Sequence, residues 1–283
     1  MATKASKSAT VLEILKGLYP DSSNSTLKKW IKHKRVYVDS LLILRSDYAV
    51  TEGMDIELDR KKSYFKEDIE ILYEDPDISV IHKPMKLLSV ATDSEKTRTA
   101  HDLLKTRYIG KRVYPVHRLD YETSGVMVFA LTKEARESLK KQFEERSTTR
   151  VYEVIVENEM TETKGKWEHF LREDGNYKMH ITKDEENAKK AITFFETIEL
   201  KKGRSFLRCT LHTGRKNQIR VQAANAGYPV IGDTKYGAKT NPIARLGLHA
   251  ATLGFAHPRS GKKFSFSYKT PLMFQRLFKN VDQ

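Results

Sequence analysis

The stretch VHRLDYETSGVMVFALT, residues 116–132, joins a cluster of charged side chains to a long apolar segment. His117, Arg118 and Asp120 lie within four residues of one another, and a Thr-Ser-Gly turn separates them from the apolar run Val126–Leu131. An unbroken apolar run of this length predicts a buried strand. Charged groups are costly to bury unless they are paired. Asp120, at the mouth of this strand, is therefore either a catalytic carboxylate or a member of a buried ion pair.

The composition indicates a soluble, globular protein. The 283 residues suffice for one large or two small domains, and 39% hydrophobic and 31% charged residues argue against disorder. No stretch approaches the roughly 18 consecutive apolar residues of a membrane span, and the N-terminus lacks the apolar core of a secretory signal. We expect residues 1–10 to be a flexible tail. The single cysteine, Cys209, permits no internal disulfide, which fits a reducing compartment and predicts a cytoplasmic protein.

Motifs for common cofactors are absent from the sequence. Neither GxGxxG nor GxxxxGK[ST] occurs, which argues against a bound dinucleotide and against ATP. One cysteine and nine scattered histidines do not form a metal-ligating pattern. We therefore expect a protein that needs no cofactor and no metal ion.

The excess positive charge lies in the last third of the chain. The net charge is +14, yet the 35 basic and 35 acidic side chains of residues 1–200 cancel. Residues 201–283 hold 16 basic residues and only two acids, Asp233 and Asp282. This asymmetry predicts a polyanionic partner. Nucleic acid is favoured over an anionic membrane surface because no basic amphipathic segment suits lipid; an ordinary solvated surface is the alternative.

Residues 10–58 have the pattern of a small separate domain. Helices are predicted from Val11 to Leu18 and from Ser25 to His33, followed by short strands at 36–38, 41–44 and 55–58. The second helix is basic, and four cations at spacings of three and four share one face: Lys28, Lys29, Lys32 and Arg35.

The helix pair, the Val-x-Val strand and the Gly-Met-Asp-Ile turn of this unit resemble the S4 RNA-binding domain. The resemblance implies that the basic helix face binds RNA phosphates, whereas an ordinary solvated face is the alternative. The sequence departs from the usual pattern at Asn24-Ser25, where Ser-Arg is usual, and at Asp39-Ser40, where Asn-Gly is usual.

The rest of the chain, after a charged linker at Asp59–Asp68, predicts a strand-rich domain. Two strands within 69–83 are joined by a Pro-containing turn; helices are expected at 99–108, 134–145 and 217–225, and strands at 151–156, 191–200, 205–211, 247–255 and 263–269. Helices and strands do not alternate regularly, which argues for the α+β class. We therefore divide the chain into domains 1–62 and 63–283.

Arg220 is a second candidate for the functional site. It stands among apolar and amide side chains, so its charge is expected to have a buried partner. Asp120 is the natural candidate, and such a pair would keep the carboxylate ionised, as a nucleophile requires. A pair with Asp233, or exposure to water, are the alternatives.

Tyr152 is a third candidate. It lies in a predicted strand whose alternation places Tyr152, Val154 and Val156 on one face. An aromatic ring beside a carboxylate in a basic cleft suits stacking on a nucleobase. An ordinary core tyrosine is the alternative.

These clusters together resemble the RluA-type family of RNA pseudouridine synthases over roughly residues 68–272. The resemblance is carried by HRLD with Thr-Ser-Gly, Arg150-x-Tyr152, Thr213-Gly214-Arg215, Gln218-Ile219-Arg220-Val221, Gly232-Asp233-x-x-Tyr236-Gly237, Leu248-His249-Ala250 and His257-Pro258. It implies a mixed, mainly antiparallel sheet and isomerisation of uridine in RNA without a cofactor. It makes Asp120 the catalytic aspartate, Tyr152 the residue that packs against the target uracil, and Arg220 the partner of Asp120.

The resemblance also implies where RNA is bound. Arg118 would lie beside the displaced RNA, and Arg215 and Lys216 would add RNA-binding cations. With the S4-like domain in front, the chain is similar to the branch that modifies large-subunit ribosomal RNA, and we expect a monomer. The alternatives are a transfer RNA substrate, a non-catalytic RNA-binding or ribosome-assembly factor on the same fold, and a nucleoside hydrolase that releases free uracil.

The sequence departs from the family pattern at a few positions. These are Asn217 and Gln222, where His is usual, Arg150, where Lys is usual, and Thr270-Pro271-Leu272-Met273, where Ala-Pro-Leu-Pro is usual. We expect none of them to touch Asp120, Tyr152 or Arg220. Their effect is then expected on RNA specificity and not on catalysis.

Overall fold

The computed structural model describes residues 2–32, 35–39, 41–58, 63–65, 69–92 and 98–278. The chain divides into two compact units, Met1–Lys62 and Ser63–Gln283, and each has a core of its own. Within the described ranges no helix is both long enough and apolar enough to cross a membrane. The predicted helix end at His33, the turn residue Ser40 and most of the expected linker lie outside the described residues.

The first unit combines two helices with short antiparallel strands. Its elements are β1 (Ala2–Lys4), β2 (Ala9–Thr10), α1 (Val11–Leu18), α2 (Asn24–Lys32), β3 (Val36–Val38), β4 (Leu41–Leu42), β5 (Ala49–Val50) and β6 (Asp55–Leu58). Four strands form a sheet in the order β1-β6-β3-β4, and β2 pairs with β5. Leu15 of α1, Leu27 of α2 and Val36 of β3 are fully buried in one core. The predicted helix pair and strands are therefore present.

The start of the chain is not the flexible tail that we expected for residues 1–10. Ala2–Lys4 pairs with β6, and Ala5 is only 3% exposed. Thr10 then begins α1 with a capping box, in which the Thr10 hydroxyl accepts from the Glu13 N–H and the Glu13 carboxylate accepts from the Thr10 N–H. The prediction was wrong because strands of two or three residues are too short to show a period.

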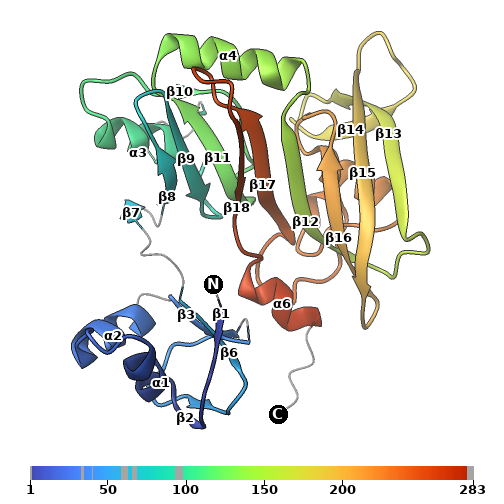
Figure 1. The fold of residues 1–283 in the computed structure, drawn as a ribbon. Helices are drawn as coiled ribbons and strands as arrows, with labels where there is room; N and C mark the ends of the chain where they lie inside the picture. Colours follow the sequence, from blue (N-terminus) through green and yellow to red (C-terminus); the bar gives the residue numbers. More distant parts are fainter. Residues whose placement is uncertain are drawn as a thin grey trace. The chain divides into compact units, whose positions relative to one another are not determined.

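The second unit is built on one large sheet. Its elements are β7 (Ser63–Phe65), β8 (Ile69–Glu74), β9 (Ile78–Lys83), α3 (Ala100–Arg107), β10 (Tyr114–Pro115), β11 (Ser124–Ala130), α4 (Lys133–Glu144), β12 (Thr149–Glu157), β13 (Lys164–Glu173), β14 (Met179–Thr182), β15 (Lys189–Leu200), β16 (Arg204–Leu211), α5 (Gln218–Asn225), β17 (Leu248–Ala256), β18 (Lys263–Ser267) and α6 (Leu272–Phe278). The strand order is β14-β13-β15-β16-β12-β17-β11-β9-β8-β7, with β10 beside β11 and β18 beside β17 (Figure 1). Of these strand pairs, β11–β17 is parallel and the others are antiparallel. The predicted mixed, mainly antiparallel α+β fold is confirmed.

Strand β11 carries the apolar run and has both faces covered. Met127 and Phe129 pack in the core that includes α3, whereas Val126 and Val128 pack in the core that includes α4. An apolar sequence without alternation is the expected result when both faces of a strand are buried. At the start of β11, Gly125 has a φ of +137°, and a Cβ there would lie 2.2 Å from a carbonyl oxygen of β17. Only glycine allows the two strands to meet at this point.

Several elements of the second unit do not follow from the sequence pattern. We did not predict β13, β14 or α6. Strand β13 exposes charged side chains along much of its length and buries only Trp167 and Leu171, which weakens its alternation. Within the expected linker, Ser63–Phe65 forms β7 and pairs with β8.

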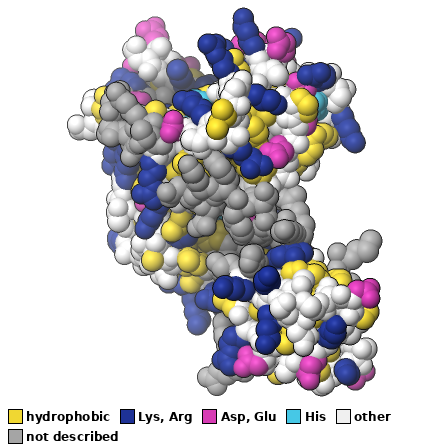
Figure 2. All heavy atoms as spheres, turned by 90° about the vertical axis from the view of Figure 1, so that its left-hand side faces the viewer, with side chains coloured by type: hydrophobic (Ala, Val, Ile, Leu, Met, Phe, Trp, Pro, Cys, Tyr) yellow, Lys and Arg dark blue, Asp and Glu magenta, His cyan; other side chains and the backbone are white. Residues whose placement is uncertain are grey.

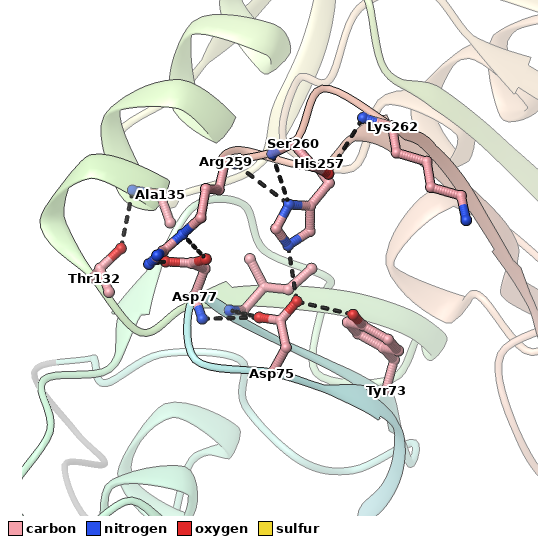
Figure 3. Close-up of polar contacts among 10 residues, drawn as sticks. Tyr73, Asp75, Asp77, Thr132, Ala135, His257, Arg259, Ser260 and Lys262 are labelled. Carbon is pink, nitrogen blue, oxygen red and sulfur yellow. Dashed lines mark hydrogen bonds and ion pairs between the residues drawn. The ribbon is translucent and has the colours of Figure 1, made fainter.

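The turn between β8 and β9 is fastened to the turn between β17 and β18 (Figure 3). Asp75 accepts hydrogen bonds from two backbone N–H groups of its own turn, from the Tyr73 hydroxyl at 2.9 Å and from His257 Nε2 at 2.8 Å. Arg259 donates two bonds of 2.6 and 2.7 Å to Asp77. Asp75, Asp77 and His257 lie close enough together to hold a metal ion. Because each is already engaged in these contacts, we interpret the group as a structural link between loops.

Candidate active site

Asp120 stands in the turn that leads into β11. The Thr123 N–H donates to the Asp120 carbonyl at 3.1 Å. The preceding residue, Leu119, is buried, and the Ser89 hydroxyl bonds both its N–H, at 2.9 Å, and its carbonyl, at 2.7 Å. The backbone is therefore fixed on both sides of Asp120, and the fold determines where the carboxylate lies.

Asp120 lines a cavity of about 530 Å³. Four other predicted site residues line the same cavity, namely Arg118, Tyr152, Arg215 and Arg220. The volume lies in the ordinary range for small-molecule sites, so the cavity has room for one nucleoside. These predicted site residues are far apart in the chain, and the fold brings them together at one cavity.

The Asp120 carboxylate makes its hydrogen bond and its ion pair through one oxygen. Oδ2 accepts a hydrogen bond from Asn217 Nδ2 at 2.7 Å and lies 3.5 Å from Arg220 Nη1. Across the part of the chain that the structure describes, no residue donates to Oδ1. The carboxylate is therefore held through one oxygen, and the other makes no contact with a donor of these residues.

Arg220 has Asp233 as its main partner, which is the alternative that the sequence left open. Its Nε lies 2.6 Å and its Nη2 2.7 Å from the two Asp233 oxygens, and both side chains are buried. Burial opposes the charge on Arg220, but the bonds to Asp233 outweigh it and raise the Arg220 pKa. The expected contact between Arg220 and Asp120 exists only as the longer, secondary one. Arg220 thus brings a permanent positive charge to Asp120 from a rigid position.

Asn217 touches Asp120, so our expectation that the family departures leave the site untouched was wrong. Asn217 precedes α5 with a φ of +50°, a left-handed conformation that Asn tolerates better than most residues. The Tyr236 hydroxyl accepts from the Met179 N–H at 3.1 Å, so its own proton is donated to Asn217 Oδ1, also at 3.1 Å. This fixes the amide with Nδ2 directed at Asp120. The left-handed preference of Asn before a helix was the signal that sequence reasoning missed.

Tyr152 lines the cavity from β12. The pairing of β12 with β17 shifts register between Val151 and Tyr152, an irregularity of the kind that redirects side chains beside active sites. Its ring packs against two hydrophobic cores, and burial raises the pKa of the phenol to about 12. Tyr152 therefore stays neutral and offers an aromatic surface to the cavity.

The remaining predicted cations of the second unit differ in what they contact. Arg118 is exposed at the cavity, and Arg215 donates from Nε to the Lys190 carbonyl at 3.0 Å. Lys216 forms an ion pair with Glu173 and does not line the cavity. On the face drawn in Figure 2, Lys and Arg side chains are scattered over the surface with Asp and Glu among them. On that face the charge excess is not one continuous stripe, so the cavity wall is the more informative place to look for RNA contacts.

The basic helix of the first unit carries most of the predicted cations. Lys28, Lys29 and Lys32 are exposed on α2. Arg35 is not helical, so it does not continue the face of α2 as we predicted. The Arg35 guanidinium lies 5.2 Å from the centre of the Trp30 ring. Three of the four predicted cations thus share the helix, and the fourth follows it.

Lys83 is a buried cation that the sequence did not single out. It is fully buried at the end of β9, and its Nζ donates to the carbonyls of Pro84 and Leu87 at 2.8 and 2.7 Å. Burial lowers its pKa to about 7, although Asp120 acts in the opposite direction. The loop that Lys83 holds is joined to the site turn by the Lys86 N–H, which donates to the Tyr121 carbonyl at 2.8 Å. Lys83 thereby supports the turn that carries Asp120.

Comparison with known proteins shows the family of the chain. The RNA pseudouridylate synthase family matches residues 77–225. Over 91% of the chain and 75% of the relative, the sequence is 32% identical to ribosomal large subunit pseudouridine synthase D of Neisseria meningitidis. It is also 29% identical to the uncharacterized RNA pseudouridine synthase YlyB of Bacillus subtilis, over 99% of the chain and 96% of the relative.

Solved structures give the same result. The chain superposes on human RNA Pseudouridylate Synthase Domain Containing 1 with a TM-score of 0.60 and 27% identity, over 72% of this chain and 84% of that one. The protein belongs to the RNA pseudouridylate synthase family. It is an enzyme that isomerises uridine in RNA to pseudouridine, as the sequence predicted.

Proposed function

We propose that Asp120 is the catalytic carboxylate and that the substrate is large-subunit ribosomal RNA. The observation that carries the first part is the geometry of the carboxylate at a nucleoside-sized cavity: Asn217 and Arg220 hold Oδ2, and none of the described residues donates to Oδ1. The second part is supported by relatives from Neisseria meningitidis and Salmonella typhimurium that are named as ribosomal large subunit pseudouridine synthases.

The isomerisation breaks the C1′–N1 bond of uridine and forms a C1′–C5 bond. The uracil is detached, rotated and rejoined, and the C5 proton is lost while N1 gains one, so no redox partner is required. Oδ1 of Asp120 either attacks C1′ or removes the proton at C2′. Both routes need a carboxylate in a fixed orientation, and the contacts of Asn217 and Arg220 with Oδ2 hold it in one.

Tyr152, Arg220 and Arg118 have distinct proposed roles. The neutral ring of Tyr152 packs against the target uracil, and Arg220 places its positive charge beside the Asp120 carboxylate. A uridine must leave its stack to reach Asp120, at a cost of about a few kcal/mol. The exposed Arg118 at the cavity offsets part of this cost by contacting the displaced RNA.

The first unit is proposed to be an S4-like RNA-binding domain. Its exposed Lys28, Lys29 and Lys32, with Arg35 beyond the helix, suit phosphates of a longer RNA. Arg215 and Lys216 are proposed to add phosphate contacts next to the cavity. We further propose a cytoplasmic monomer, which gel filtration and cell fractionation test.

The decisive experiment replaces Asp120 with Asn. We expect Asp120→Asn to abolish tritium release from RNA labelled at uridine C5 while RNA binding persists, since the amide keeps the shape but is no nucleophile or base. A variant that still made pseudouridine would refute the role of Asp120. Mapping pseudouridines in RNA from cells with and without this gene tests the ribosomal target. If the pseudouridine that is lost lies in a transfer RNA, the proposed substrate is wrong and transfer RNA is the substrate. Free uracil among the products would instead indicate a hydrolase.

A further inference from the structure

Three arginines meet on one wall of the cavity. Arg146 follows the end of α4, Arg150 lies on β12, and Arg215 lies in the turn before α5. All three line the cavity that also holds Asp120. Two of them, Arg146 and Arg150, were not predicted as RNA-binding residues from the sequence.

The contacts of these arginines are made to neutral groups. Arg146 Nη1 donates to the His212 ring at 3.2 Å, and Arg150 Nη2 donates to the His212 carbonyl, also at 3.2 Å. Arg215 Nε donates to the Lys190 carbonyl at 3.0 Å. Among the described residues, none of the three guanidinium groups has a carboxylate within ion-pair distance. Three positive charges therefore converge on this wall, and no described carboxylate forms an ion pair with them.

The convergence has an electrostatic cost. Burial lowers the pKa of Arg150, and the charges of Arg215 and Arg146 lower it further. Burial and the charge of Arg146 likewise lower the pKa of Arg215. A guanidinium nevertheless stays protonated in proteins, so the repulsion is not relieved by proton loss. An anion in the cavity would relieve it.

Arg150 is held in place before any ligand binds. Its guanidinium lies 5.7 Å from the centre of the Phe143 ring. A Cβ on Gly214 would lie 2.4 Å from Arg150 Nη1, so the absence of a side chain at Gly214 makes room for it. Its Nε is buried and has no hydrogen-bond acceptor among the described residues. A positioned guanidinium with an unused donor is suited to receive an oxyanion.

We propose that Arg146, Arg150 and Arg215 form a binding site for a backbone phosphate of the RNA, next to the target uridine. The placement rests on the proposed role of Asp120, because that carboxylate defines where the target nucleotide lies. The planar fork of a guanidinium matches two oxygens of a phosphate. A nucleotide that enters the cavity carries its own phosphodiester groups with it, so a phosphate is the anion that the substrate delivers to this wall.

The site is tested by steady-state kinetics at several salt concentrations. The variants are Arg146→Gln/Arg215→Gln and Arg150→Gln, and the substrate is C5-tritiated bulk RNA from cells that lack this gene. We expect the KM of the double variant to rise about tenfold or more, with kcat within about twofold. We also expect the salt dependence of log kcat/KM to become shallower by about 0.7, the value for one phosphate contact of single-stranded RNA.

Two control variants separate this site from general charge effects and from misfolding. Arg276→Gln removes an exposed charge on α6 that does not line the cavity, and it should keep the wild-type KM and salt slope. Arg146→Lys/Arg215→Lys keeps the charges and should restore the salt slope. An unchanged slope in Arg146→Gln/Arg215→Gln, or an equal loss in Arg276→Gln, would overturn the proposal. Because Arg146 is exposed, Arg146→Gln alone serves if the other variants do not fold.

The test is also independent of catalysis. RNA binding by Asp120→Asn, with and without Arg146→Gln/Arg215→Gln, gives the same salt slopes without turnover. If Asp120→Asn stayed active, the proposed function would fail, whereas a difference between these binding slopes would still support the phosphate site. If Asp120→Asn is inactive and the slopes agree, the phosphate site alone is refuted.

Discussion

Asn217 offers a sharp test of how the site holds its carboxylate. Its amide donates to Asp120 Oδ2 at 2.7 Å and accepts from the Tyr236 hydroxyl at 3.1 Å. A hydrogen bond to a charged group contributes about 1.5–3 kcal/mol, and about 1.4 kcal/mol corresponds to a factor of ten. If this bond holds Asp120 for the reaction, its removal should lower kcat by about ten- to a hundredfold.

The backbone at position 217 supplies a matched pair of variants. Its φ is +50°, a conformation that glycine adopts freely and alanine does not. Asn217→Gly and Asn217→Ala both remove the amide, but only alanine should lose about a further 1–2 kcal/mol in the free energy of unfolding.

We expect the two variants to have the same kcat and different stabilities, measured by tritium release and by urea unfolding. Equal and near-normal kcat values in both variants would refute a role for the amide in holding Asp120. A kcat that followed stability instead would show that the amide acts through folding alone.

Three further predictions concern buried charges. Asp233→Ala leaves Arg220 buried without its main partner and should lower the unfolding free energy by about 3–5 kcal/mol; a loss in urea unfolding below about 1 kcal/mol would contradict the pairing. Burial lowers the pKa of His249 to about 3, so between pH 6.5 and 3 the unfolded chain binds a proton that the folded one does not. Stability should therefore rise with pH across this window, so that it is lost as the pH drops from 6.5 to 3, by up to about 1.4 kcal/mol per unit from this group, and His249→Gln should flatten this pH dependence. The Lys83 pKa of about 7 gives the same sign in a higher window: the unfolded state binds the extra proton between pH 7 and 10.5, so stability rises with pH across it as well. Lys83→Met should remove that rise in thermal unfolding, and an unchanged profile would show that Lys83 is charged in the folded state.

Much of the site could be predicted because its charged residues stand in stretches of sequence where a charge is not expected. Asp120 stands out before an apolar strand, and Arg220 stands out in an uncharged segment. Both line the cavity, as does Tyr152. The sequence favoured Asp120 as the main partner of Arg220 and left Asp233 as the alternative, because the positions of the two carboxylates relative to Arg220 depend on the fold.

What could not be predicted depends on distances across the fold. Asn217 looks like an ordinary polar residue until Tyr236 fixes its amide and Asp120 appears beside it. Lys83 stands at the end of a strand, where a lysine is usually exposed, and only the structure shows that it is buried. Strand β13 was missed because a half-exposed strand rich in charged side chains shows little alternation.

The parallel contact between β11 and β17 has a consequence for how the enzyme is made. Ser124 and His249 are paired although 125 residues separate them, and Gly125 permits the close approach of the two strands. Contacts of such long sequence separation form late, because a large loop must close first. The turn that bears Asp120 is synthesised early, but β11, which follows it, can pair with β17 only after β17 has emerged from the ribosome. A nascent chain that has passed residue 220 but not residue 256 would thus hold every proposed catalytic residue and still lack an assembled site.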